Sequence, residues 1–236
     1  MKALSICRSL AVAATALTAL AAEADTVVLT KLTGLVGSAP AIATAVYKAS
    51  LGGLPGSFAA IAIKDNSGAL GGAAGQFSGF DLDAIKLSTT DCADAACAAS
   101  AVGLSLFNFT TGVVFTPGSQ RAPADAKLFG TGPAGNTLNN AVATLGFFDG
   151  VATTDASATG FISLGDNGSI AFNLTALTAP TGLFLYIGEV GDNGEVAASN
   201  ITVLQNPVPE PETYALMLAG LGLLGWIGRR RRGAAR

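Results

Sequence analysis

The stretch Phe161–Leu174, FISLGDNGSIAFNL, sets Gly-Asp-Asn-Gly between two short apolar runs. A second stretch, Leu183–Leu204, LFLYIGEVGDNGEVAASNITVL, carries the same four residues at 191–194. Asn-Gly readily adopts the positive φ angles that tight hairpin turns require. The two stretches therefore predict two β-hairpins. Asp65–Gly68, DNSG, is a looser turn of the same type.

Short apolar runs bounded by Gly, Asn and Asp recur between these turns, and no long apolar repeat of 3.6 residues is sustained. The pattern predicts an all-β fold, an antiparallel, jelly-roll-like β-sandwich over residues 25–204, with a closed barrel as the alternative. Ala41–Leu51 also fits a helix because it is rich in Ala, and a strand is preferred there. The expected strands are Thr26–Leu32, Ala41–Ala49, Ser57–Lys64, Phe80–Ser88, Ser105–Phe109, Gly112–Phe115, Ala141–Phe147, Thr159–Leu164, Ser169–Leu174, Leu183–Val190 and Glu195–Leu204.

Composition narrows the chemistry that the chain can perform. Of its 236 residues, 12% are charged and none is histidine, which excludes Ser-His-Asp, Cys-His and His-zinc sites. Residues 25–206 hold 13 acidic and 6 basic residues, a net charge of −7. Nucleic-acid binding needs Lys and Arg contacts to phosphate, so no nucleic-acid partner is expected. No nucleophile motif stands out either, and we expect a protein that is not an enzyme.

Residues 1–24 have the pattern of a secretory signal peptide. Lys2 and Arg8 precede the apolar run Leu10–Leu20, and Ala22–Ala24 has the small-x-small form of a cleavage site. The mature chain would then begin near Asp25, after export by the Sec machinery and cleavage by signal peptidase. A second cleavage site after Ala21 and an uncleaved N-terminal anchor are the alternatives.

The C-terminal end has three parts in order. A Pro-rich linker, 205–213, contains Val208, Pro209, Glu210 and Pro211, the apolar segment 214–228 follows, and the basic tail 229–236 begins with Arg229, Arg230, Arg231 and Arg232. Fifteen helical residues reach only about 22 Å, against a hydrocarbon core of about 30 Å. The arginine cluster stops transfer and stays in the cytoplasm by the positive-inside rule. The pattern predicts a short transmembrane helix that holds the domain outside the inner membrane transiently, with a permanent anchor as the alternative.

This tail resembles the PEP-CTERM sorting signal of exported proteins in Gram-negative bacteria. The resemblance covers Val208–Arg232 and implies an exosortase as the processing partner, with cleavage near Pro209-Glu210-Pro211. It also implies release from the inner membrane to the cell surface, outer envelope or exopolysaccharide matrix. The two prolines keep the peptide extended, as a protease subsite requires.

Two pairs of side chains are candidates for a structural or binding role. Cys92 and Cys97 form an even pair in an exported chain, which predicts a disulfide, with two free thiols as the alternative. Asp81 and Asp83, in GFDLDAI, would project from one face of a strand and are candidate calcium ligands. A solvated acidic pair without a ligand is the simpler interpretation, and no other cofactor is expected.

These observations lead to two hypotheses for the domain. The first is a structural or adhesive protein of the cell surface or exopolysaccharide matrix. The second is a carbohydrate-binding module of the envelope or biofilm matrix, with calcium at Asp81 and Asp83 near the glycan. An ice-binding surface would need a regular Thr array, and Thr is scattered here.

Overall fold

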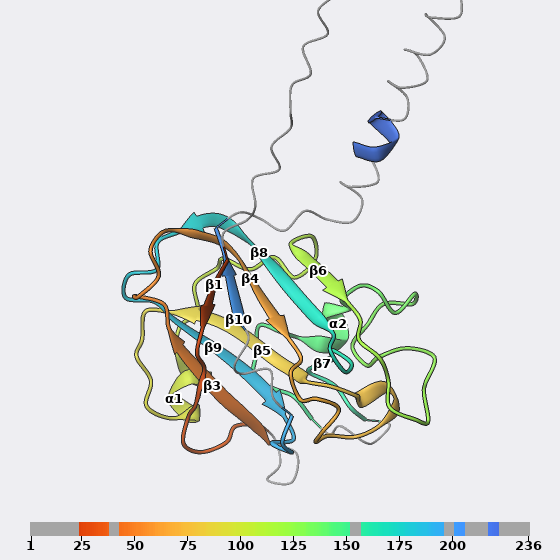
Figure 1. Ribbon diagram of the computed structural model, residues 1–236. Coiled ribbons are helices and arrows are strands. Elements are labelled where there is room, and N and C mark those ends of the chain that lie inside the picture. The colour runs from red at the N-terminus through yellow and green to blue at the C-terminus, as the bar shows by residue number, and fades with distance from the viewer. Residues whose placement is uncertain (1–23, 38–42, 152–156, 196–200, 206–216, 222–236) are drawn as a thin grey trace, which may run out of the picture.

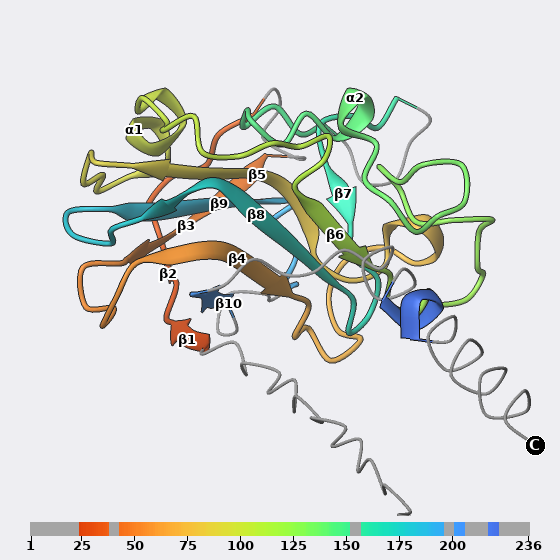
Figure 2. The same ribbon diagram turned by 90° about the horizontal axis from the view of Figure 1, so that it is seen from above.

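The computed structural model describes residues 24–37, 43–151, 157–195, 201–205 and 217–221. These residues form two antiparallel sheets of five strands each, stacked face to face (Figures 1 and 2). Sheet A has the order β1 (Ala24–Val27), β10 (Ile201–Leu204), β4 (Phe58–Lys64), β8 (Ser169–Thr178) and β6 (Val113–Thr116). Sheet B has the order β2 (Thr30–Lys31), β3 (Thr44–Ser50), β9 (Phe184–Val190), β5 (Asp81–Ser88) and β7 (Ile162–Ser163).

The connections between strands repeatedly cross the sandwich. From β3 to β10, each strand lies in the sheet opposite to the strand before it. With the short β2 and β6 set aside, this is the strand order of a jelly roll, in which two Greek keys interlock. The predicted antiparallel two-sheet fold is confirmed.

The main hydrophobic core lies between the two sheets. Alternate residues of each strand point inward, because successive side chains of a strand project to opposite faces. Fully burying one such Leu, Ile or Phe side chain contributes about 1.5–3 kcal/mol. The largest fully buried side chains of this core, on the strands and the adjoining loops, are Leu51, Phe58, Ile61, Ile63, Phe80, Leu82, Ile85, Leu87, Leu145 and Phe172.

Sheet B is covered on its outer side as well. The helices α1 (Ala95–Ser100) and α2 (Asn140–Ala143) both lie on the side of β5 that faces away from β4 (Figure 2). Val46 and Tyr186 of sheet B pack there against residues of α1 in a second hydrophobic cluster. The Tyr186 hydroxyl donates to the Thr90 carbonyl oxygen at 2.6 Å and accepts from the Cys92 N–H at 2.9 Å, which fixes the loop before α1.

The prediction of two β-hairpins is wrong. The chain does turn at both places, but the strands on either side of each turn do not pair with each other. The turn at 165–168 joins β7 of sheet B to β8 of sheet A, and the turn at 191–194 likewise leads from β9 to β10. Asn167 has the expected positive φ of 65°, whereas in the second turn Asp192 and Gly194 have positive φ and Asn193 does not. The turns connect strands that face one another across the core instead of strands that pair.

Three other predicted strands also differ. Residues 141–147 contain the end of α2, whose C-cap Thr144 has a left-handed backbone conformation with φ 41°. Residues 105–109 form only a single β-bridge, between Phe107 and Leu174. Thr26–Leu32 is divided between β1 and β2 because the chain passes from sheet A to sheet B there. Residues 44–50 form a strand, so the strand interpretation of Ala41–Ala49 is correct over the helical alternative.

The first and the last strand of the domain lie side by side. Ala24 at the start of β1 pairs with Leu204 at the end of β10. Leu204 also pairs with Ala60 near the start of β4, so Lys64 and the turn that follows it lie at the opposite end. We call these the terminal end and the turn end of the sandwich.

The predicted membrane segments lie largely outside the described residues. Of the signal peptide 1–24 only Ala24 is described, and of the segment 214–228 only 217–221, which are helical. Within the described ranges, no helix has both the length and the apolar character needed to cross a bilayer. The transmembrane helix and the signal peptide therefore stay predictions.

Candidate functional sites

Three turns of similar sequence meet at the turn end. They lie at residues 65–68, 165–168 and 191–194, and each carries the chain from one sheet to the other. Because the strands before them come from both sheets, the turns converge over the end of the core. Their acidic side chains are thereby brought together, although they are far apart in the sequence.

Asp65 joins the first two turns. Its carboxylate accepts hydrogen bonds from the N–H groups of Phe80 at 3.0 Å and Asn167 at 2.8 Å, and from the Ser67 hydroxyl. Its own N–H donates to the Gly168 carbonyl oxygen at 2.8 Å. The Asp65 side chain is buried, and these donors compensate for its loss of water.

Arg121 connects the second turn to the residues that follow the first and the third turns. Its Nη2 lies 3.2 Å from the Glu195 carboxylate, and its Nε lies 3.4 Å from Asp166. Its Nη1 also donates to the Gly71 carbonyl oxygen. Gly72 makes this packing feasible, because a Cβ atom there would stand only 1.6 Å from Glu195 Oε1.

Three further carboxyl groups at the turn end are almost without water contact. Asp81, Glu189 and Glu195 have exposed fractions of 0%, 0% and 1%. Burial raises the pKa of Glu189 to about 9, with further contributions from the charges of Glu195 and Asp192. Burial and the charge of Asp81 raise the pKa of Glu195 to about 9 against the opposing effect of Arg121. The Asp81 pKa is likewise raised well above its ordinary value by burial, which outweighs its hydrogen bond from Ser163.

The candidate calcium ligands Asp81 and Asp83 are both fully buried, and they have different partners. Asp83 accepts from the N–H groups of Asp149 at 3.1 Å and Gly150 at 2.9 Å, and from the Thr44 hydroxyl. Burial still raises the Asp83 pKa to about 7. The two aspartates are therefore not a solvated acidic pair. Calcium binding at this pair stays an untested prediction.

A groove lined by phenylalanines opens beside β5. It has a volume of about 700 Å³ and is bordered by Phe107, Phe109, Phe147 and Phe148. The rings of Phe107 and Phe109 are stacked, with centroids 5.8 Å apart and planes 11° apart. The Lys86 ammonium lies 5.1 Å from the Phe148 ring centroid at the groove wall. Phe147 is 70% exposed.

The polar groups of this groove differ in availability. Lys86 donates to the carbonyl oxygens of Ala98, Ala99 and Ala101 at 2.8–3.0 Å, which are among the last carbonyls of α1 and the residues after it. Its ammonium is therefore already used to cap that helix. Asp149 lines the groove and is exposed; its Oδ1 accepts from the Thr144 hydroxyl at 2.7 Å, and the carboxylate can still accept a further hydrogen bond from a ligand.

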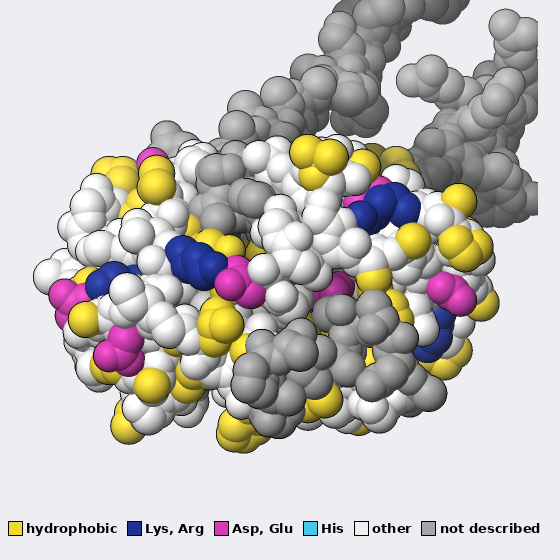
Figure 3. Space-filling view, turned by 90° about the horizontal axis from the view of Figure 1, so that it is seen from below, with side chains coloured by type: hydrophobic (Ala, Val, Ile, Leu, Met, Phe, Trp, Pro, Cys, Tyr) yellow, Lys and Arg dark blue, Asp and Glu magenta, His cyan; other side chains and the backbone are white. Residues whose placement is uncertain are grey.

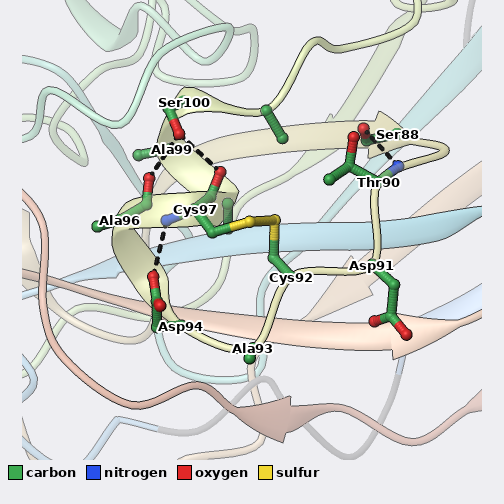
Figure 4. Close-up of a disulfide and its surroundings, with 12 residues drawn as sticks. Ser88, Thr90, Asp91, Cys92, Ala93, Asp94, Ala96, Cys97, Ala99 and Ser100 are labelled. Carbon is green, nitrogen blue, oxygen red and sulfur yellow. Dashed lines mark hydrogen bonds between the residues drawn. A yellow bond between two sulfur atoms is a disulfide. The ribbon is translucent and has the colours of Figure 1, made fainter.

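The predicted disulfide is confirmed. Cys92 and Cys97 are bonded, with Cα atoms 5.5 Å apart, and the bond ties the loop before α1 to its first turn (Figure 4). Asp94 caps the same helix, since its carboxylate accepts from the Cys97 N–H at 2.8 Å. The disulfide and the cap together fix a helix of only six residues.

Charged side chains on the turn-end side of the surface are dispersed. Figure 3 views the molecule from below and shows small basic groups, each lying near an acidic one, among hydrophobic and uncharged groups. The described residues on this face form no continuous basic field of the kind that phosphate backbones require.

The chain carries, at residues 207–232, a match to the family described as the PEP-CTERM protein-sorting motif. The match spans the four residues of the Pro-Glu-Pro region and the four arginines that were predicted to direct sorting. Comparison with curated proteins and with solved structures gave no significant match.

The motif implies the class of exported proteins that an exosortase processes at the membrane. Within that class, the chain is a PEP-CTERM domain-containing protein with a two-sheet antiparallel domain ahead of its sorting motif. The motif residues Val208, Pro209, Glu210, Pro211 and Arg229–Arg232 lie outside the described residues.

Several residues of these sites were not predicted from the sequence. Arg121 and Glu195 carry no local signal, because their roles depend on segments more than 70 residues apart. The phenylalanine groove is likewise formed by two loops, around 103–109 and 146–149. The one sequence signal that could have pointed to these residues was the repeated Asp-Asn turn, since the three turns that contain it meet where the buried acidic residues lie.

Proposed function

We propose that this protein is a non-enzymatic structural or adhesive component of the cell surface or exopolysaccharide matrix. The observation that carries the proposal is the position of the sorting motif, which begins three residues after the last residue of β10. An exosortase that cuts near Pro209-Glu210-Pro211 would release the β-sandwich whole, with only a short C-terminal extension. Signal peptidase and the Sec machinery would act at the other end.

The pairing of Ala24 with Leu204 supports this arrangement. Both ends of the domain leave the sandwich at the terminal end, so a domain tethered through its tail presents its turn end away from the membrane. The absence of histidine from the sequence removes the commonest general base, and this favours a binding or structural role.

Fractionation of native host cells with and without a functional exosortase tests the proposal. The expected result is release of the sandwich to the surface or matrix when exosortase is present, and retention of a longer form in the inner membrane when it is absent. Equal release in both strains would contradict it. Loss of biofilm cohesion in a strain lacking this protein would support the structural or adhesive role.

A second candidate function is carbohydrate binding at the phenylalanine groove. Stacked Phe107 and Phe109 and the exposed ring of Phe147 offer apolar faces on which sugar rings can pack, and Asp149 offers a hydrogen-bond acceptor. The groove is also within the size range of small-molecule sites. Direct titration with the host's own exopolysaccharide tests this candidate.

A further inference from the structure

Two of the three turns at the turn end have the same sequence. Gly-Asp-Asn-Gly occupies residues 165–168 and again residues 191–194, so Asn167 and Asn193 each precede a glycine. Glycine has no Cβ and the freest main chain of any residue, which lets its nitrogen approach the side-chain amide of a preceding asparagine. The local sequence therefore gives both asparagines a similar intrinsic reactivity, and a difference between them in the folded protein comes from how each turn is held.

The reaction in question is deamidation, which makes asparagine one of the thermolabile residues. The glycine nitrogen attacks the side-chain carbonyl carbon of the asparagine and a C–N bond forms, while the amide nitrogen takes up the proton of the glycine N–H and leaves as ammonia. Water then opens the resulting succinimide ring at one of its two carbonyls, which leaves either aspartate or isoaspartate. The step needs only water as co-reactant, together with a glycine N–H free of other bonds and a main chain that can rotate.

The turn at 165–168 is held on both sides of the peptide bond between Asn167 and Gly168. The Gly168 N–H donates to the Gly165 carbonyl oxygen at 2.9 Å, and the Gly168 carbonyl oxygen accepts from the Asp65 N–H at 2.8 Å. The Asn167 N–H donates to the Asp65 carboxylate at 2.8 Å. The nitrogen that would attack is therefore already a hydrogen-bond donor, and turning the main chain there would disturb all three hydrogen bonds.

Neighbouring backbone also surrounds Gly168. This glycine is buried, and a Cβ atom on it would stand 1.8 Å from the Leu164 carbonyl oxygen and 2.6 Å from the Gly118 nitrogen. The main chain of this turn consequently has no room to rotate unless the turn first opens.

The turn at 191–194 is open at the corresponding atoms. Asn193 and Gly194 are exposed, and a Cβ atom on Gly194 would meet nothing closer than the Gly71 Cα atom at 4.0 Å. Within the described residues the Gly194 N–H makes no hydrogen bond. The attacking nitrogen is therefore free, and the main chain around it is not crowded.

This turn is fastened at its ends and not at its centre. Lys31 pairs with Asp192 just before Asn193, and the Arg121 guanidinium lies 3.2 Å from the Glu195 carboxylate just after Gly194. These ion pairs keep the turn in place on the sandwich while leaving the reacting peptide unit between them exposed to water.

We propose that Asn193 is a site of spontaneous deamidation in the folded protein and that the fold protects Asn167 from the same reaction. Asn193 can react in the native structure, whereas Asn167 reacts only when its turn opens locally. Local openings of well-bonded segments are rare, so Asn193 should react about tenfold faster than Asn167, or more.

Conversion at position 193 has a consequence for the turn end. It adds a negative charge next to Asp192, which already shares Lys31, and like charges repel one another. Isoaspartate also lengthens the main chain by one CH2 group and shifts Glu195 relative to Arg121. The converted protein should be less stable, and because the reaction is irreversible, the converted fraction increases with the age of the folded chain.

The experiment incubates the full chain at pH 7.5 and 37 °C, one portion folded and one portion in denaturant, and measures aspartate and isoaspartate at both positions by peptide mass spectrometry over time. In denaturant, Asn167 and Asn193 should convert at similar rates, because only their local sequence acts. In the folded portion Asn193 should convert about tenfold faster than Asn167, or more. Equal rates at the two positions in the folded portion would overturn the proposal. So would an unconverted Asn193 at a time when the denatured portion has reacted completely.

Two variants test the consequence for stability. Asn193→Gln should remove the site, because the longer side chain would have to close a larger ring, and Asn167→Gln is the matched control from the other turn. Thermal unfolding compares fresh and aged samples of each. The aged unmodified chain and aged Asn167→Gln should unfold at a lower temperature than their fresh samples, whereas aged Asn193→Gln should keep its midpoint. An equal decline in both variants would contradict the assignment of the damage to position 193.

Discussion

The Arg121 guanidinium stands 3.2 Å from the Glu195 carboxylate and joins two loops that are 74 residues apart in the chain. Arg121 is also the cation nearest to Asp166, at 3.4 Å. One side chain thus connects the second turn of the turn end to the residue that follows the third. The stability of that end should depend on this arginine more than on any single turn residue.

Replacing Arg121 by Gln should therefore destabilise the domain strongly. Removing one partner of a largely buried ion pair typically costs about 3–5 kcal/mol. Here the charge left buried and unpaired is that of Asp166, which is 6% exposed, and Glu195 also loses its hydrogen bond from Arg121. Arg121 is 21% exposed at its side chain, so the lower part of that range, about 3 kcal/mol, is expected. Chemical denaturation measures it. Lys127→Gln is the control, and a loss no larger than that of the control would contradict the role of Arg121.

Asp83 should make stability depend on pH between weakly acidic and neutral conditions. Its folded pKa of about 7 lies above the ordinary 3.8, so the folded state binds the proton more tightly than the unfolded chain. The stabilisation is complete at pH below the ordinary value and is lost as the pH rises toward 7.

The variant Asp83→Asn should flatten this part of the profile while keeping the fold, since an amide can accept from Gly150 and donate to Thr44. Denaturation in the presence of a chelator, at several pH values from 4 to 8, checks it. An unchanged slope in the variant would contradict the assignment of this titration to Asp83.

The disulfide should contribute modestly to stability. It closes a loop of only five residues of separation, for which loop entropy gives about 2 kcal/mol. Cys92→Ser with Cys97→Ser should lower the free energy of unfolding by that amount and make it insensitive to reductant. The unmodified protein measured with and without reductant is the control. Equal stability of both forms would show that the Asp94 cap alone fixes α1.

The sorting motif predicts a processing phenotype. Replacing Glu210 by Ala, or deleting Arg229–Arg232, should leave a longer form in the inner membrane of the native host. Glu212→Ala is the matched control, because it lies beside the motif and carries the same charge. Immunoblots of membrane and released fractions measure the outcome. Normal release of the Glu210 variant would contradict recognition of Glu210 by an exosortase.

The phenylalanine groove gives a test of carbohydrate binding. Phe147 is 70% exposed, so Phe147→Ala should leave stability nearly unchanged and weaken binding of the host's exopolysaccharide at least tenfold. Leu177→Ala is the control, because Leu177 is 67% exposed and does not border the groove. Calorimetry or retention on immobilised polysaccharide serves as the readout. Equal binding by both variants would locate any glycan contact elsewhere.

The positions of the strands could be predicted from the sequence better than the pairing between them. Alternating apolar residues and Asp-Asn turns are local signals, and β4, β5, β8 and β9 form close to where they were expected. A turn at 165–168 looks the same whether it closes a hairpin or crosses between sheets. Only the packing of both sheets on one core selects the crossing, and no short stretch of residues contains that information.

The candidate sites were predictable only in part. The Cys92–Cys97 bond follows from spacing and the sorting motif from three adjacent features. Asp81 was singled out from a local pattern, yet its hydrogen-bond partner Ser163 lies on β7. Local alternation along β5 suggested Asp83 as the partner, whereas Asp83 is bound by the backbone of residues 149 and 150.

The pairing of β1 with β10 has a consequence for how the domain is made. Among the described strands, β1 hydrogen-bonds to β10 alone, so the first strand to be synthesised has no partner until the last one arrives. Such long-range closure makes folding slow relative to chains with local contacts. The sandwich is therefore completed only after nearly all of the polypeptide has been delivered, a sequence of events that suits a chain threaded through a translocation pore unfolded.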